Sequence, residues 1–210
     1  IFFQLASGNS PKLSDHWGED ARPWSPAAAA LGILCLQNFC VGGSMASKVK
    51  GNGPSLKSLQ MLLQGNSLRE TLLRNCLDLE TLQQTGGTLG KPVWEAAPDN
   101  SLLARLAPTS CALWLSDDSA KTLIDQGYQY PEYEAYRDPY ATTFTVKDTR
   151  CLLRANLEKG VWRDLHLITN LKNAEDASGP LNLQSFNNRR AIEEKTELWV
   201  GELIKADDAK

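Results

Sequence analysis

The sequence predicts an α+β fold, in which helices and antiparallel hairpins are mixed without the regular alternation of a parallel sheet. Three observations support this: a well-capped helical segment near residue 26, two strand-like segments joined by a tight turn near residue 148, and no internal repeat. The chain has 210 residues, of which 42% are hydrophobic and 22% charged. That is enough apolar material for the core of one domain, or of one domain with a small subdomain.

The first helix is expected from residue 26 to about residue 41. Ser25 is a favoured N-cap residue, and Pro26 stands at the first helical position, where its missing N–H costs nothing. Leu31, Cys35 and Phe39 follow at four-residue spacing, which predicts that they form the core-facing side of this helix.

A second helix is expected to begin after Ser67. Glu70 stands three residues later, which is the capping-box spacing. The apolar positions predict a single core-facing side, made by Leu68, Leu72, Leu73 and Cys76.

The strand predictions lie mostly in the second half of the chain. Residues 142–147 and 150–157 are expected to form a hairpin turning through Asp148 and Thr149, and residues 196–204 to form a further strand. Residues 55–65 predict a strand or a short helix, and residues 161–171 a short helix. The segments 83–100 and 173–180 are predicted to be loops.

Charge and cysteine content exclude several classes. The net charge of −3 gives no global electrostatic signal for nucleic acid, so any such site has to be local. No apolar run suits a membrane span, and the first residues do not resemble a signal peptide. The unpaired cysteines indicate a reduced, cytoplasmic protein. The five cysteines lack paired spacing, which predicts neither a zinc site nor a disulfide scaffold, and no cofactor is expected.

Enzyme chemistry is an alternative with little support. Cys35 with His16, or Cys151 with His166, would be candidate nucleophile–base pairs, but neither cysteine stands in a glycine-flanked turn. No Walker motif is present. The acidic pairs lack metal-ligand spacing; they are Asp117–Asp118, Glu193–Glu194 and Asp207–Asp208. A plain interaction scaffold is a third class, to which the tyrosines between residues 128 and 140 would contribute a packing surface or base-stacking platform.

The segment after the first helix has the strongest local signal for a phosphate-bearing partner. Gly42 and Gly43 allow close backbone approach to a ligand, and Ser44, Lys48 and Lys50 follow. A glycine C-cap followed by a surface loop explains the same residues without a ligand.

An ordered set of segments resembles the large subunit of the type I-E CRISPR Cascade complex, the CasA/Cse family. The segments are LASGNSPKLSDHW, PWSPAAAALGILCLQNFCVGG, GPSLKSLQMLLQGNSLRETLLRNCL, KPVW, RDPYATTFTVKD, VWRDLH and LWVGELIKADDAK. The resemblance covers nearly the whole chain and is weakest at residues 100–130 and 170–195. It implies that residues 1–210 form part of the large N-terminal domain, without the C-terminal four-helix bundle.

The resemblance implies a non-catalytic subunit of an RNA-guided surveillance complex. Such a subunit recognises a short motif beside the target (the PAM) in double-stranded DNA from the minor groove, helps to unwind the duplex, and presents it to a recruited helicase–nuclease. The implied partners are the CRISPR guide RNA, the target duplex, the other Cascade subunits and the helicase–nuclease, with no membrane. A scaffold subunit without base reading is the alternative, followed by a cysteine-dependent hydrolase.

The resemblance also assigns roles to residues. The family's glycine loop falls on Gly42, Gly43 and Ser44, with Lys48 and Lys50 nearby, and its lysine finger falls on Lys147. Without the resemblance, Lys147 would be an exposed hairpin lysine that protects a sheet edge.

The remaining assignments are a wedge and a guide-proximal loop. The wedge, which parts the first base pairs, falls on Asp207, Asp208 and Ala209, although two aspartates depart from the amide-bearing family pattern. A second wedge candidate is the segment 187–190. The loop near the guide end and the PAM falls on Leu13, Ser14, Asp15 and His16. The zinc-binding cysteine pairs of some relatives are missing.

Overall fold

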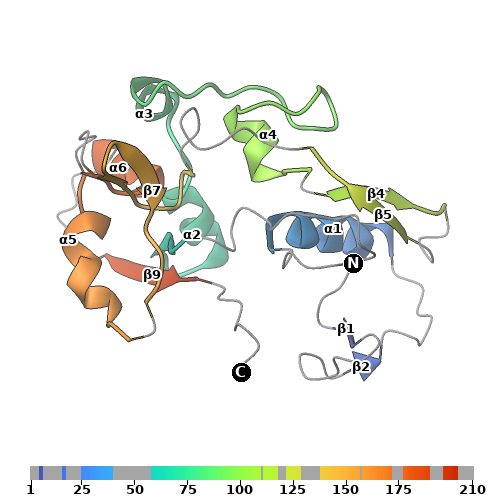
Figure 1. Cartoon of the computed structure of the whole chain (residues 1–210), viewed down its shortest axis with the longest axis horizontal. Coiled ribbons are helices and arrows are strands. Elements are labelled where there is room, and N and C mark those ends of the chain that lie inside the picture. The colour runs from blue at the N-terminus through green and yellow to red at the C-terminus, as the bar shows by residue number, and fades with distance from the viewer. Residues whose placement is uncertain are drawn as a thin grey trace. The chain divides into compact units, whose positions relative to one another are not determined.

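The computed structural model describes residues 5–6, 16–17, 25–39, 58–109, 111–117, 122–128, 138–156, 158–171, 177–189 and 196–202. The chain divides into two compact units (Figure 1). The first comprises Ile1–Leu56 and Leu106–Gln129, and the second comprises Lys57–Arg105 and Tyr130–Lys210. Helices and mostly antiparallel strand pairs are mixed in the order along the chain, which confirms the predicted α+β class. Among the helices in the described ranges, none is long and apolar enough to cross a bilayer.

The first unit is built on helix α1, Pro26–Phe39, and on the antiparallel pair of β4, Cys111–Leu115, with β5, Thr122–Gln126. A short parallel pair, β1 (Leu5–Ala6) with β2 (His16–Trp17), also belongs to it. The Ala28 N–H donates to Ser25 Oγ at 3.2 Å, so the N-cap of α1 is confirmed.

The predicted core face of α1 is wrong. Leu31 is 69% exposed and Phe39 38% exposed, whereas Leu36 is buried against Cys111 and Leu113. The buried side is fixed by Gln37, whose amide donates to the Cys111 carbonyl at 2.6 Å and accepts from its N–H at 2.8 Å. A polar side chain that pairs with a strand backbone therefore chooses the face, which apolar spacing alone does not reveal.

The second unit has two sheets among the described residues. Strand β3, Gln60–Gln64, pairs antiparallel with β9, Glu197–Gly201. The other sheet has the order β7-β6-β8, with β6 at Thr143–Val146, β7 at Thr149–Leu152 and β8 at Ala177–Ser178. The expected strand at 196–204 and the expected hairpin are confirmed. The segment 55–65, expected to be a strand or a short helix, contains strand β3. Strand β8 lies in the segment 173–180, for which the sequence predicted a loop.

Short helices accompany these strands in the second unit and at its boundary. The predicted segment 161–171 contains the 3-10 helix η4 and helix α5. The sequence did not predict α3, α4 or α6 as separate helices. The bounds are α2, Leu68–Arg74; α3, Leu79–Gln84; α4, Leu102–Leu106; η4, Val161–Asp164; α5, Leu165–Ile168; and α6, Leu181–Arg189.

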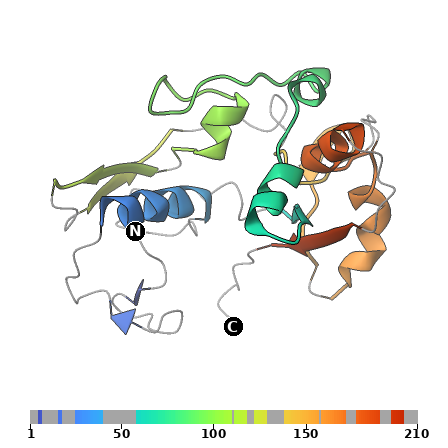
Figure 2. The same cartoon turned by 180° about the vertical axis from the view of Figure 1, so that it is seen from behind.

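The core of the second unit lies along β3. It contains Leu59, Met61 and Leu63, together with Leu153, Ile168, Leu183 and Phe186 from later segments. Leu198 and Val200 on β9 pack against the same cluster. Helix α2, drawn in teal, lies against the β3–β9 pair in both views (Figures 1 and 2).

Side-chain amides satisfy backbone groups of β3 that β9 does not bind. Asn75 accepts from the Leu63 N–H at 2.9 Å and donates to the Leu63 carbonyl at 2.8 Å, as a neighbouring strand would. Asn182 on α6 donates to the Met61 carbonyl at 2.9 Å and to Asn75 Oδ1 at 2.7 Å. Unpaired backbone groups are costly when buried, so these two asparagines protect this edge of the sheet.

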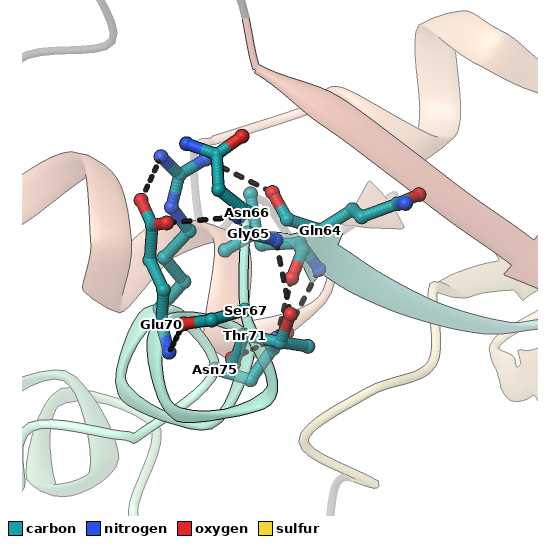
Figure 3. A network of polar contacts seen from close by, with 9 residues as sticks. Gln64, Gly65, Asn66, Ser67, Glu70, Thr71 and Asn75 are labelled. Atoms are coloured by element: carbon teal, nitrogen blue, oxygen red, sulfur yellow. Dashed lines mark hydrogen bonds and ion pairs between the residues drawn. The ribbon is translucent and has the colours of Figure 1, made fainter.

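The start of α2 is capped as predicted, with one difference (Figure 3). The Glu70 N–H donates to Ser67 Oγ at 3.2 Å, while the Glu70 carboxylate accepts from the Asn66 N–H at 2.8 Å, one residue earlier than in a capping box. Thr71 and Asn75 face β3. Asn75 binds Leu63 in the strand, and Thr71 Oγ1 accepts from the N–H of Gly65, the residue after the strand, at 3.0 Å. The predicted apolar core face of α2 is therefore wrong, and the side chains expected there are exposed.

Candidate nucleic-acid interface

Lys147 lies at the tip of the β6–β7 hairpin. Val146 pairs with Thr149, so the turn consists of Lys147 and Asp148, one position earlier than expected. Both residues have positive φ, 48° and 64°, which is the backbone of a type I′ turn. Both side chains are exposed. Across the described residues, the Lys147 ammonium has no carboxylate within ion-pair distance, so it is available to an external acceptor.

The turn conformation is unusual for its sequence. Type I′ turns favour asparagine and glycine, because a side chain at positive φ crowds its own backbone, at a cost of roughly 1–2 kcal/mol per residue. Here a lysine and an aspartate adopt it together. Strain of this kind persists where the surrounding sheet holds it in place, and it is concentrated at functional sites.

Arg150 on β7 ties the hairpin to the third strand of its sheet, β8. Its Nε donates to Thr143 Oγ1 and its Nη2 to Ser178 Oγ, both at 3.1 Å, which ties β7 across β6 to β8. Partial burial lowers the pKa of Arg150 from its usual value, because desolvation disfavours the charged form. Sequence reasoning did not predict a role for Arg150. The only indication in the sequence is that a charged residue stands within a predicted strand.

The base of the hairpin is anchored to β3 through a buried carboxyl group. Asp138 accepts from the Tyr140 N–H at 2.9 Å and from Gln60 Nε2 at 3.1 Å. Burial raises the pKa of Asp138, although these hydrogen bonds and the charge of Arg105 act in the opposite direction. The Met61 N–H donates to the Tyr140 carbonyl at 2.8 Å, so the segment entering β6 is fixed to the core strand.

Most other residues assigned by resemblance lie outside the described residues. His16 lies in β2, where its backbone pairs with Leu5. The residues not described are Leu13, Ser14, Asp15, Gly42, Gly43, Ser44, Lys48, Lys50, Asp207, Asp208 and Ala209. Their assignments stay predictions.

The second wedge candidate is disfavoured by the structure. Residues 187–189 end helix α6 and do not form a projecting turn. Asn188 donates to Thr81 Oγ1 at 2.9 Å, and Arg189 donates to carbonyl groups at the end of α2, including that of Cys76 at 2.6 Å. Both side chains are therefore engaged in holding helices together.

The other candidates from the sequence are only partly described: Asp118, Glu193 and Glu194 lie outside the described residues. The Cys151 thiol donates to the Thr149 carbonyl at 3.6 Å, and His166 Nδ1 lies 3.2 Å from the Arg163 carbonyl, so each contacts its own local backbone. Tyr128 is exposed, and Tyr140 is half-buried at the hairpin base, while the tyrosines between them are outside the described residues. Within the described ranges, no group of three histidine, cysteine or acidic side chains could hold a metal ion.

Comparisons with known proteins agree on one family. The model of the family "CRISPR-associated protein Cse1" matches residues 1–210. A CRISPR-associated protein CasA/Cse1 from Thermus thermophilus is 27% identical, over 89% of this chain and 42% of its own length.

Solved structures show the same fold. A CRISPR-associated protein from Thermus thermophilus has a TM-score of 0.64 at 20% identity, covering 89% of this chain and 44% of its own. The structure of Thermus thermophilus CasA (Cse1) has a TM-score of 0.59 at 21% identity, covering 86% and 44%. A chain of a CRISPR RNA-guided surveillance complex has a TM-score of 0.51 at 20% identity, covering 86% and 41%. The chain thus spans less than half the length of the relatives it matches.

Proposed function

The chain belongs to the CRISPR-associated Cse1 family, and we propose from this premise that it acts as the large, non-catalytic subunit of an RNA-guided surveillance complex. In this role it recognises the PAM in double-stranded DNA from the minor groove and assists the first step of unwinding. It then presents the opened target for recruitment of a helicase–nuclease. Its partners are the guide RNA, the target duplex and the other subunits of the complex.

The observation that carries this proposal is Lys147 at the tip of a braced hairpin. Its turn projects an exposed ammonium group without a carboxylate partner among the described residues. The minor groove is about 6 Å wide and presents acceptors on every base pair, adenine N3 and thymine O2 among them. A single lysine on a narrow two-residue turn suits such a groove, and a degenerate acceptor code allows more than one PAM.

The other elements of the proposal rest on the family resemblance. The glycine loop at Gly42 and Gly43 would place bare backbone against the groove, with Lys48 and Lys50 near phosphates. The segment at Asp207, Asp208 and Ala209 would stand where the duplex first opens.

Replacement of Lys147 by alanine tests the function. We expect the assembled complex with Lys147→Ala to bind PAM-containing duplex about 1–3 kcal/mol more weakly, the range for a base-edge contact. Its affinity for duplex with a scrambled PAM should change little, so the PAM preference itself falls. Equilibrium binding to both duplexes at several salt concentrations measures this.

The matched control is Lys159→Ala, which removes the same charge from another exposed position of the second unit. It should leave PAM preference unchanged. If Lys147→Ala weakens both duplexes equally and reduces the salt dependence by about one charge, Lys147 is a phosphate contact. If binding is unchanged, Lys147 does not read the PAM.

A further inference from the structure

Helix α2 exposes leucines along one side. Leu68, Leu72 and Leu73 are 75%, 61% and 57% exposed, and none of the α2 residues is buried. Leu68 and Leu72 are one turn apart and lie on the same side of the helix, and Leu73 lies on the adjoining side. The three exposed leucines are here called the α2 stripe. Contiguous exposed leucines are unfavourable in water and mark sites where another molecule binds.

A pocket of about 390 Å³ adjoins the α2 stripe. Its walls come from α2 and α6, and they are made by Glu70, Leu73, Arg74, Phe186 and Arg189. Because Leu73 belongs to both, the stripe and the pocket form one continuous surface. The pocket therefore adds two arginines and one glutamate to the margin of an apolar face.

The pocket has more positive than negative charge. Arg74 Nη2 pairs with Glu70 at 2.5 Å, and Arg74 Nη1 donates to the Gln64 carbonyl at 3.0 Å. Arg189 donates to neutral carbonyl groups, those of Ser185, Leu73, Arg74 and Cys76. Two guanidinium groups thus share one carboxylate in this pocket.

One donor of Arg74 is unsatisfied in the protein interior. Arg74 Nε is buried and has no hydrogen-bond partner among the described residues. A buried charged donor without an acceptor is costly. A carboxylate entering this pocket would compensate the excess positive charge of its two guanidinium groups.

We propose that the α2 stripe and this pocket bind an amphipathic segment of another protein subunit, with apolar side chains on the stripe and an aspartate or glutamate in the pocket. Leucine side chains offer a phosphate neither charge nor a hydrogen-bond donor, which favours protein over nucleic acid as the occupant. The charge of the pocket complements an acidic side chain. The inference rests on the proposed function, because the partner is another subunit of the same surveillance complex.

The test measures assembly of the full chain with the remaining subunits and guide RNA, without any target DNA. Leu72→Asp places a carboxylate on the stripe, and because Leu72 is exposed the fold should tolerate it. We expect at least about tenfold weaker association, which corresponds to about 1.4 kcal/mol. Leu165→Asp is the control, since Leu165 is 49% exposed on α5 and outside this surface.

Circular dichroism of both variants establishes that they are folded. Equal affinity of Leu72→Asp and the wild-type chain overturns the inference and leaves the proposed function intact, as does an equal loss with Leu165→Asp. The chain could instead self-associate, and Leu72→Asp could abolish this while assembly of the complex is retained. That result would assign the surface to a second copy of the chain and would also overturn the inference. If the wild-type chain does not join the complex at all, the inference and the proposed function both fail.

Discussion

At the scale of single residues, buried amides hold a core strand in place where apolar side chains usually would. The Asn75 side chain makes four hydrogen bonds to described residues, two with Leu63, one to the Thr71 carbonyl and one from Asn182. The position of β3 therefore depends on side chains that are distant in sequence, because residue 182 lies on α6.

Asn75→Ala is expected to lower the free energy of unfolding by roughly 2–4 kcal/mol, because it leaves the N–H and carbonyl of Leu63 unsatisfied in a buried strand. Urea denaturation followed by circular dichroism measures this. Asn66→Ala is the control, since the Asn66 side chain is exposed and only its backbone N–H is bonded in the capping network. A loss below about 0.5 kcal/mol for Asn75→Ala would show that β3 does not need this amide.

Sequence reasoning worked for residues whose role is local and failed for those whose partners are remote. Ser25 and Ser67 cap their helices because the bonded N–H lies three residues away. Asn182, Gln184 and Ser185 gave the segment 181–189 no helical signal, yet they are buried in a helix. Their hydrogen-bond partners come from other elements or from the preceding turn, which no local pattern reports.

At the scale of elements, the β6–β7 hairpin combines a strained tip with a firm base. Phe144 packs against the core cluster, and Arg150 joins all three strands. The sequence predicted this hairpin well, because alternation and β-branched residues are local signals. It placed the turn one residue late, because no asparagine or glycine marks the two positive-φ positions.

Replacement of Asp148 by glycine is expected to raise the free energy of unfolding by about 0.5–1 kcal/mol, since glycine adopts positive φ without steric cost. Asp164→Gly is the matched control, because Asp164 has φ −99° and glycine there relieves no such strain. Thermal denaturation of both variants tests this. A lower stability for Asp148→Gly would mean that the aspartate side chain, and not the backbone, sets the turn.

Helix faces were the least predictable feature of the elements. In both α1 and α2, apolar residues recur at helical spacing. The side that faces the core is nevertheless determined by polar residues that bind strand backbone, Gln37 for α1 and Asn75 for α2. The leucines left exposed on α2 are the residues for which we propose a partner subunit.

At the scale of the whole molecule, the family and fold class were predictable from the order of the segments, which the match over residues 1–210 confirms. The candidate site was only partly testable, because Lys147 is described while the glycine loop and the wedge are not. Their contribution has to be measured in the assembled complex with DNA.

Unwinding gives one such measurement. Parting a base-pair step costs a few kcal/mol, so a wedge has to be firmly held as guide pairing begins. Replacing Asp207 and Asp208 together by glycine should slow the opening of fully paired targets and spare targets already melted beside the PAM. Stopped-flow fluorescence of a base analogue at the first paired position follows the opening. Equal rates for the variant and the wild-type chain on both targets would place the wedge elsewhere.

The most direct test of the central claim is the position of residue 147 on a bound target. A photo-crosslinking amino acid at position 147 of the assembled complex should crosslink to the PAM base pairs of a target duplex, and the same group at position 159 should not. Mapping the crosslinked nucleotides by sequencing gives the answer. Crosslinks from position 147 confined to PAM nucleotides are the predicted result, whereas crosslinks to protein alone, or an equal yield from both positions, would contradict the account.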